Sequence, residues 1–433
     1  MKRSLLLLSF VFQLFTASAQ EVLTLSDAMK LLLANNFDLQ MAKQDVDLAK
    51  LNASRGNAGM LPQVGVNGSV GIASNDTKQE FSNGTLVDKN GASSKTAALG
   101  AGMTWTLFDG MKMFATFDRL QEEQGRSELV LRSQMENAIV QLIKTYSGIV
   151  RQKQLLLAAD FALQQYEERM EISKTRWDVG AGSKMDYLQA KVDYNGQKAI
   201  RMQQSNQLEN LKIELNELLG RAATVVYDVA DSMQISYRPN LEDVMTDALK
   251  QNTSILIGSS QQRVQQLMMK ELSSSRYPRL NWNAGYNFNN TANQAGFILQ
   301  NRNLGWSTGL SASWTLYNGH QINHQIEGSR ILLQQAQISL DQTKQRIDAG
   351  VMKAYLRFNS SMELLSQEEE NSVLANEVMQ VAMERYRLGG ASNLELKDAQ
   401  RSYEEAQSRL VNARYDAKLA ETDLMQLNGM LVK

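Results

Sequence analysis

An internal repeat constrains the fold of this chain more than any other feature. The hexapeptide WTLFDG at residues 105–110 returns as WTLYNG at residues 314–319, an offset of 314 − 105 = 209 positions. Upstream, Pro62 corresponds to Pro278, with an offset of 278 − 62 = 216 positions. Self-similarity at a fixed offset means that one structural unit occurs twice, so the fold has to be interpreted as two copies of that unit.

The two copies differ in length within one short segment. Seven positions (216 − 209 = 7) are added to the first copy between Pro62 and Trp105, where residues 74–95 are rich in Asn, Gly, Ser and Asp. We predict an exposed loop there, because these residues favour turns and because loops tolerate insertions. The predicted division of the chain is a signal peptide at 1–19, a first repeat at 20–220, a linker at 221–240 and a second repeat at 241–429.

The first residues have the pattern of a secretory signal peptide. Lys2 and Arg3 precede an apolar run, and the small residues Ala17 and Ala19 mark a cleavage site. The chain has no cysteine, which excludes disulfides and thiolate metal sites. The net charge of −1 offers no electrostatic case for binding nucleic acid. No later stretch is apolar enough for a membrane helix, so we expect a periplasmic protein, a secreted protein or an outer-membrane β-barrel.

Four segments alternate between apolar and small polar residues, two in each repeat. The predicted strands are at about 62–74, 97–108, 279–290 and 304–317. Each is as long as a tilted membrane-spanning strand, with one apolar and one polar face. A soluble β-sandwich with one buried face is the alternative interpretation. Aromatic residues near the strand ends indicate a membrane girdle: Trp105, Phe108, Trp314 and Tyr317.

Long helical runs follow each pair of strands. Scarce proline and apolar residues at alternating spacings of three and four predict coiled-coil hairpins at 111–219 and 319–428. Shorter helices are expected earlier in each repeat, at about 26–35, 39–55, 241–251 and 255–274. One predicted packing stripe runs along the returning helix of the first hairpin: Met185, Leu188, Val192, Asn195, Ala199 and Met202. The other runs along the last helix: Ala399, Tyr403, Ala406, Leu410, Ala413, Ala417, Ala420, Leu424 and Leu427.

Glycine-containing turns connect the two helices of each hairpin. Glycine ends the outgoing helix, and Ser or Asn caps the returning one. The predicted turn residues are Val179, Gly180, Gly182 and Ser183 in the first hairpin, and Leu388, Gly389, Gly390 and Ser392 in the second.

Four membrane strands cannot close a barrel, because an open sheet edge is not viable in lipid. The chain must therefore share a barrel with other copies of itself. With its two hairpin turns, followed by SKMDYLQA at 183–190 and SNLELKDAQ at 392–400, it resembles the TolC-like outer-membrane factor (outer membrane efflux protein) family. The resemblance implies an α+β membrane protein. It also implies a homotrimer whose four strands per chain form a shared 12-stranded transmembrane β-barrel, continued by an α-barrel of long hairpins.

The resemblance also implies a function. A chain of this family is expected to be a passive outer-membrane channel with a long periplasmic extension. It would serve as the exit duct of a tripartite efflux pump or a type I secretion system. The implied partners are a periplasmic adaptor (membrane fusion) protein, an inner-membrane transporter and outer-membrane lipid, with no cofactor and no nucleic acid. The alternative is a periplasmic coiled-coil adaptor or structural tether without a channel.

The resemblance further implies that the gate of the channel lies at the periplasmic tips of the hairpins. Tyr386 matches a gate tyrosine, and Asp186 matches its carboxylate partner. Glu395 and Asp398 match a pair that forms an acidic constriction ring, although their charge also suits a helix N-terminus. The basic latch of some members is replaced by Ala391. Arg385 and Arg387 are the candidates for a substitute, and the hairpin turns are the expected adaptor contacts.

No catalytic or metal site is predicted. His320 and His324 have a spacing that can hold zinc, but no HExxH pattern supports such a site. We interpret them as polar residues at the junction of strand and helix. No supported acid/base or nucleophile set is present in the sequence either, so we do not expect an enzyme.

Overall fold

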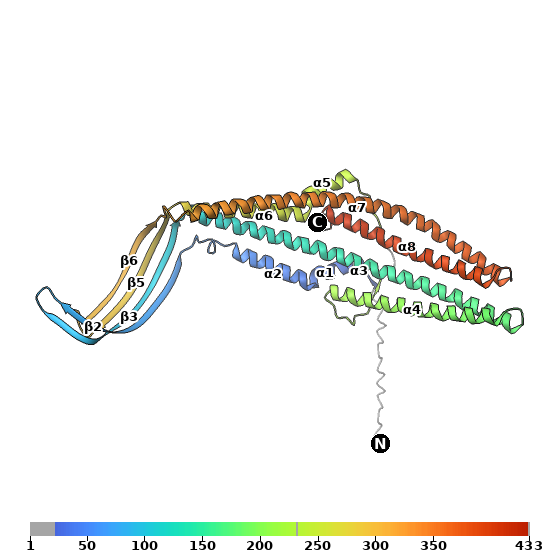
Figure 1. Ribbon diagram of the computed structural model, residues 1–433, viewed down its shortest axis with the longest axis horizontal. Helices are drawn as coiled ribbons and strands as arrows, with labels where there is room; N and C mark the ends of the chain where they lie inside the picture. The colour runs from blue at the N-terminus through green and yellow to red at the C-terminus, as the bar shows by residue number, and fades with distance from the viewer. Residues whose placement is uncertain (1–21, 231–232, 432–433) are drawn as a thin grey trace, which may run out of the picture. The chain divides into compact units, whose positions relative to one another are not determined.

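The computed structural model describes residues 22–230 and 233–431, and the predicted signal peptide at 1–19 lies outside this range. The chain divides into two compact units. Unit 1 comprises Met1–Met41, Gln134–Asn252 and Ile347–Lys433, and unit 2 comprises Ala42–Ser133 and Thr253–Arg346. Each unit takes segments from both sequence repeats. The two longest helices, at residues 112–178 and 321–387, each have one part in unit 1 and the other in unit 2. Figure 1 labels these helices α3 and α7.

The observed elements are these: β1 Val22–Leu23, α1 Leu25–Asn35, α2 Phe37–Asn52, β2 Gln63–Glu80, β3 Leu86–Phe108, α3 Lys112–Asp178, α4 Lys184–Leu218, β4 Asp228–Val229, α5 Leu241–Gln251, α6 Thr253–Ser273, η1 Ser274–Arg276, β5 Arg279–Asn293, β6 Gln300–Ser313, α7 Gln321–Arg387 and α8 Asn393–Leu427. No helix among them is both long and apolar enough to cross a membrane.

A four-stranded sheet is the main feature of unit 2. Its order is β2-β3-β5-β6, and every neighbouring pair is antiparallel. Directly paired residues share a face of a sheet, so the register assigns each residue to a side. Gly65, Gly102, Gly285 and Ser307 lie in one row on the polar face. The opposite face exposes Val64, Val66, Val70, Ile72, Leu99, Leu304, Trp306 and Leu310.

Several predicted strand boundaries were wrong. The segment 74–95 is mostly strand, because β2 continues to Glu80 and β3 begins at Leu86. Backbone hydrogen bonds between β2 and β3 hold this segment as a two-stranded ribbon in spite of its loop-like composition. The register of the pairing shifts once, near Asn75. The last strand ends at Ser313 rather than 317. Its partner β5 begins directly after Pro278, which has no N–H to continue the ladder.

The repeat is also visible in the backbone where strands give way to helices. Gly110 and Met111 have φ values of 72° and 71°, and their counterparts Gly319 and His320 have values of 65° and 64°. Few residues other than glycine adopt this left-handed conformation. Met111 and His320 therefore complete the same turn in both copies. The ring of Tyr317 meets that of His320 edge-on, with 5.5 Å between the centroids.

In unit 1, the short helices α1 and α5 pack against the middle of α3 and α7 and against the C-terminal ends of α4 and α8. The largest core combines α1, α3, α4, β1 and β4, with Leu32, Leu142, Ile149 and Leu215 fully buried. The second copy has a smaller equivalent, in which α5 packs against α7 and α8. The N-cap of α1 is Thr24, whose side-chain hydroxyl accepts the N–H of Asp27 at 3.2 Å.

Matching contacts join the short helices to the long ones in both copies. The side-chain amide of Asn36 donates to the Leu218 carbonyl at 2.9 Å, and that of Asn252 donates to the Leu427 carbonyl at 3.0 Å. The following glycines have left-handed backbones, with φ of 65° at Gly220 and 72° at Gly429. The turn after each returning helix is thus fixed against the end of a short helix.

Candidate functional site: the tips of the helical hairpins

The two hairpin turns have the same backbone structure. Gly180 and Gly389 adopt φ values of 76° and 81°. In both turns, the N–H of the next residue donates to the carbonyl five positions earlier at 2.8 Å. This is the Schellman arrangement, in which a left-handed residue ends a helix. Ser183 and Ser392 then cap the returning helices by accepting backbone N–H groups at 3.0 and 3.1 Å.

Tyr386 lies at the contact between the two hairpins. Its side chain is buried, and its hydroxyl is 2.7 Å from the Ser173 hydroxyl on α3. The guanidinium of Arg176 stacks over its ring at 4.5 Å and donates to its carbonyl. The predicted partner Asp186 is half-buried in the first turn of α4, and no hydrogen bond to Tyr386 occurs within the described parts. In this conformation α3, rather than α4, supplies the groups that hold Tyr386.

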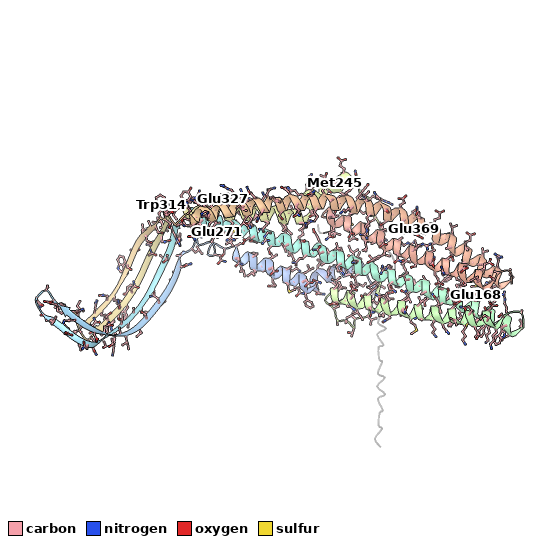
Figure 2. All side chains as sticks on the ribbon, in the orientation of Figure 1. Glu168, Met245, Glu271, Trp314, Glu327 and Glu369 are labelled. Carbon is pink, nitrogen blue, oxygen red and sulfur yellow. The ribbon has the colours of Figure 1, made fainter. Side chains whose placement is uncertain are left out.

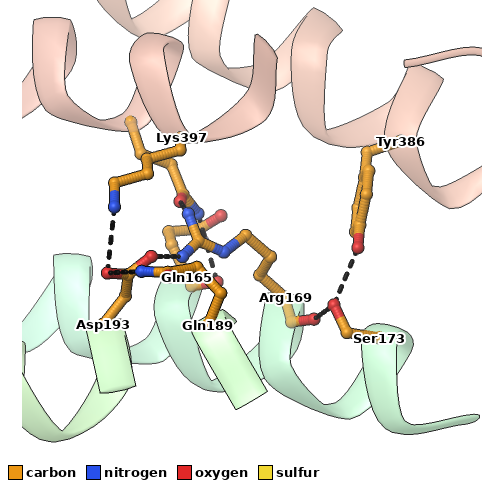
Figure 3. A network of polar contacts seen from close by, with 8 residues as sticks. Gln165, Arg169, Ser173, Gln189, Asp193, Tyr386 and Lys397 are labelled. Atoms are coloured by element: carbon orange, nitrogen blue, oxygen red, sulfur yellow. Dashed lines mark hydrogen bonds and ion pairs between the residues drawn. The ribbon is translucent and has the colours of Figure 1, made fainter. Parts of the chain in front are cut away.

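A buried ionic cluster lies beside Tyr386 (Figure 3). Arg169 on α3 has 0% exposure, donates to the Gln400 side chain at 2.9 Å and forms an ion pair with Asp193 on α4. Lys397 on α8 approaches the same carboxylate at 3.0 Å, and Gln189 donates to it at 3.1 Å. One carboxylate therefore joins three helices from both hairpins.

The charges around Asp193 decide its protonation. Burial by itself would raise the pKa of Asp193, but the hydrogen bond from Lys397 and the charge of Arg169 bring that pKa below its usual value. Glu404, one turn from Gln400, has a different environment. Burial raises the pKa of Glu404, and the hydrogen bond from Tyr166 opposes this only in part.

The structure distinguishes the two candidates for the missing basic latch. Arg387 donates from Nε to Glu168 on α3 at 2.7 Å, so it joins the two hairpins. Arg385 binds Glu395 at 2.6 Å and the Gly390 carbonyl at 3.0 Å, so it stays within its own hairpin. Ala391 is buried in an apolar cluster with Tyr386. Arg387 is therefore the residue positioned to link the tips.

The two members of the predicted acidic pair have different surroundings. Both line a groove of about 520 Å³ between α7 and α8, which Val378 and Val381 also line. Glu395 is paired with Arg385, whereas Asp398 is exposed and forms no ion pair with the residues described. Within this groove Arg385 offsets the charge of Glu395, so the excess negative charge comes from Asp398 together with Glu377.

Sequence reasoning missed the residues that join the tips. Arg169 and Ser173 are buried on α3, on the face that also buries Ala159, Ala162 and Tyr166. The sequence did contain a signal for both residues, because Arg169 and Ser173 continue the spacing of three and four residues along this face. Coiled-coil spacing predicts an apolar face, so it gives no reason to expect an arginine and a serine on that face.

Two apolar stripes are exposed to solvent among the described residues. The predicted stripe on α8 is buried for the most part, with Tyr403 and Leu427 only half-buried. The predicted stripe on α4 is instead exposed, at Met185, Leu188, Val192 and Met202. The face of α4 that is buried carries Ala190, Gln197 and Leu208. A second exposed stripe lies on α7, with the spacing of one helical face: Leu374, Val378 and Val381.

The predicted girdle residues lie in unit 2, where strands meet helices. The indole N–H of Trp105 donates to the Met60 carbonyl at 2.9 Å. The indole N–H of Trp314, which Figure 2 labels where the strands meet the helices, donates to the Arg276 carbonyl at 3.0 Å. Trp314 and Tyr317 follow the end of β6 and are exposed, and Phe108 at the end of β3 is half-buried. The polar edges of both indoles are thus paired, while their apolar rings are partly accessible.

These features define a class of protein: an α+β outer-membrane factor with a four-stranded sheet and two long helical hairpins. The family model for outer membrane efflux proteins matches residues 28–221 and 244–430. The chain therefore belongs to the outer membrane efflux protein family, as the sequence predicted. It is a non-enzymatic export channel of the outer membrane with a periplasmic extension.

Individual relatives agree with this assignment. Outer membrane protein TolC of Escherichia coli is 21% identical over 421 residues, covering 92% of this chain and 83% of TolC. The proteases secretion protein PrtF of Dickeya chrysanthemi is 21% identical, with coverages of 99% and 95%. The solved outer-membrane channel OprN has the same fold, with a TM-score of 0.78 at 19% identity and coverages of 94% and 89%.

Proposed function

We propose that three copies of this chain form a continuous duct, which conducts substrates passively out of a tripartite efflux pump or a type I secretion system. The observation that carries this proposal is the sheet of unit 2. It has one exposed apolar face, one polar face and two edge strands, β2 and β6, that lack a partner in the sheet. An open edge is not viable in lipid, whereas a barrel of twelve strands shared by three copies leaves none.

The exposed stripes of unit 1 support the same assembly. In a ring of three copies, the α4 stripe of one copy packs against the α7 stripe of the next. The girdle residues Trp105, Phe108, Trp314 and Tyr317 then lie at the membrane interface. The proposal keeps the division into repeats at 20–220 and 241–429. Each repeat supplies two strands and one helical hairpin to the duct.

The hairpin tips are the proposed gate and adaptor contact. An inner-membrane transporter supplies the energy, and a periplasmic adaptor binds at the turns around Gly180 and Gly389. Tyr386, Asp186, Glu395 and Asp398 line the gate in this proposal. The contacts of Tyr386 with Ser173 and Arg176 hold the second hairpin against the first, and opening requires that these contacts separate.

Replacing Val192 by glutamate is expected to convert the trimer into monomers. The change places a carboxylate in an apolar contact, which is unfavourable unless the charge is neutralised. Native mass spectrometry of the detergent-extracted protein measures the outcome, with negative-stain imaging to detect a tube. Lys198→Glu is the matched control, because it adds negative charge at an exposed position of α4 outside the stripe. A wild-type protein that is monomeric would refute the shared duct.

The ion selectivity of the channel tests the proposed acidic ring at the hairpin tips. Because Arg385 offsets Glu395, Asp398→Asn is expected to reduce the preference for cations more than Glu395→Gln does. Arg385→Gln is expected to increase that preference, since it frees the glutamate. Reversal potentials across planar bilayers under a salt gradient measure all three effects. No effect of either carboxylate substitution would contradict the proposed ring, whereas equal effects would contradict the offset of Glu395 by Arg385.

A further inference from the structure

The loop between β5 and β6, residues 294–299, is fixed to the neighbouring ribbon of β2 and β3. The Gln294 N–H donates to the Ser93 carbonyl at 2.9 Å, and the Ser93 N–H donates to the Gln294 side chain at 3.2 Å. Lys89 donates to the Gln294 carbonyl at 3.1 Å. These bonds hold the loop in a defined position at the end of the sheet that is remote from the strand–helix junctions.

The loop leans over the polar face of the sheet. It encloses a cleft of about 450 Å³ together with Asn75, Thr77 and Gln79 of β2. These alternate residues continue the side of β2 that carries Gly65 and Asn67, because successive side chains of a strand point to opposite faces. The close approach requires Gly296, whose φ is 108° and whose added Cβ would lie 3.3 Å from the Gln79 side chain.

The tip of the loop is apolar although its surroundings are polar. The ring of Phe297 contacts that of Phe81 on the β2–β3 ribbon, with 6.0 Å between the centroids. Phe297 nevertheless remains 84% exposed, and Ile298 and Leu299 are 56% and 59% exposed. Three adjacent exposed apolar residues on an anchored loop indicate a contact surface.

We propose that the loops 294–299 of three copies meet over the channel axis and form an apolar constriction at the outer mouth. The partner of this surface is the same loop in the neighbouring copies. The inference rests on the proposed trimeric duct, in which the polar faces of three sheets enclose the lumen. A loop that leans over the polar face then leans toward the axis, and it brings Phe297, Ile298 and Leu299 with it.

Such a constriction has a functional consequence. A ring of apolar side chains excludes water more readily than a polar one, as in hydrophobic gates of other channels. The wall beneath it is polar, with Asn283 and Asn287 projecting from β5 and Arg279 on the same face near the helices. The outer mouth would thus restrict hydrated ions and large hydrophilic solutes independently of the hairpin tips.

Single-cysteine cross-linking tests the proposal directly, because the natural chain contains no cysteine. In outer membranes that contain the full-length Ile298→Cys variant, a short bismaleimide is expected to shift most of the monomer band to covalent dimers. Lys78→Cys is the matched control. It is exposed on the opposite face of the β2–β3 ribbon and is expected to remain monomeric.

The native mass of each variant before cross-linking distinguishes the possible failures. A monomeric mass would overturn the proposed duct itself, and this inference with it. A trimeric mass without cross-linked Ile298→Cys product would overturn the constriction alone, as would equal cross-linking of both variants. A second readout is bilayer conductance: Phe297→Ser combined with Leu299→Ser is expected to raise it, and an unchanged conductance would contradict the constriction.

Discussion

Replacing Arg169 by methionine is expected to loosen the junction between the two hairpin tips at a cost of about 3–5 kcal/mol, the range for breaking a buried ion pair. Arg169 has 0% exposure and pairs with Asp193, whose side chain is 12% exposed. The substitution removes the cation and leaves the carboxylate with Lys397 as its remaining charged partner. Amide hydrogen exchange measures the effect. We expect faster exchange at the C-terminal end of α3 and the N-terminal end of α8, and unchanged exchange in the strands of unit 2.

The double variant Arg169→Met with Asp193→Leu is the control for this prediction. Replacing both partners by apolar residues of similar size is often neutral, because no unpaired charge stays buried. The double variant is therefore expected to recover most of the lost protection. A double variant as mobile as the single one would mean that the size of Arg169, rather than its charge, holds the tips together.

The same pair predicts how the junction responds to pH. The folded state lowers the pKa of Asp193 below its ordinary value, so the contribution of the ionised carboxylate to stability is fully present above that ordinary value. The contribution is lost as the pH falls through the lower, folded-state pKa. The difference between wild type and Arg169→Met should thus be constant near neutral pH and should shrink in strong acid. Hydrogen exchange at matched intrinsic rates reports this trend.

Replacing Gly220 by alanine is expected to destabilise unit 1 by about 3 kcal/mol, the sum of a left-handed backbone and a steric overlap. Gly220 has a φ of 65°, and an added Cβ would lie 2.6 Å from the backbone oxygen of Asn35. Backbone atoms cannot rotate away as a side chain can, so α1 must shift from the end of α4. Thermal unfolding of the detergent-solubilised protein measures the loss.

Two further glycines serve as internal controls. Gly180 has a φ of 76° but no atom within 4 Å of an added Cβ, so alanine there is expected to cost about 1 kcal/mol from the backbone alone. Gly429, the counterpart of Gly220 in the second copy, would meet the Gln251 oxygen at 2.9 Å, and its substitution should cost more than that at Gly180. Equal losses at Gly180 and Gly220 would mean that the contact with Asn35 relaxes freely.

Much of this architecture could be predicted because it depends on local pattern. A spacing of two implies a strand, and a spacing of three and four without proline implies a long helix. The turns at Gly180 and Gly389 followed from glycine chemistry alone. The repeat strengthened each of these predictions, since it required every element to occur twice.

The errors came from places where local composition and tertiary pairing disagree. Residues 74–95 have the composition of a loop, yet the backbone of β2 finds a partner in β3 along most of that segment. The α4 stripe has the spacing of a packed face, yet the chain packs α4 through Ala190 and Gln197 and leaves Val192 exposed. Spacing identifies an apolar face, but it does not tell whether the same chain or another copy covers it.

The sequence by itself determined the repeat, the element types, the family and the location of the tips, because each of these depends on residues close together in the chain or on a comparison of its halves. Only the tertiary structure decided which groups meet at the tips. The partners of Asp193 are Arg169, 24 positions away, and Lys397, 204 positions away. Contacts over such separations depend on the relative rotation of packed helices, and a single sequence does not specify that rotation.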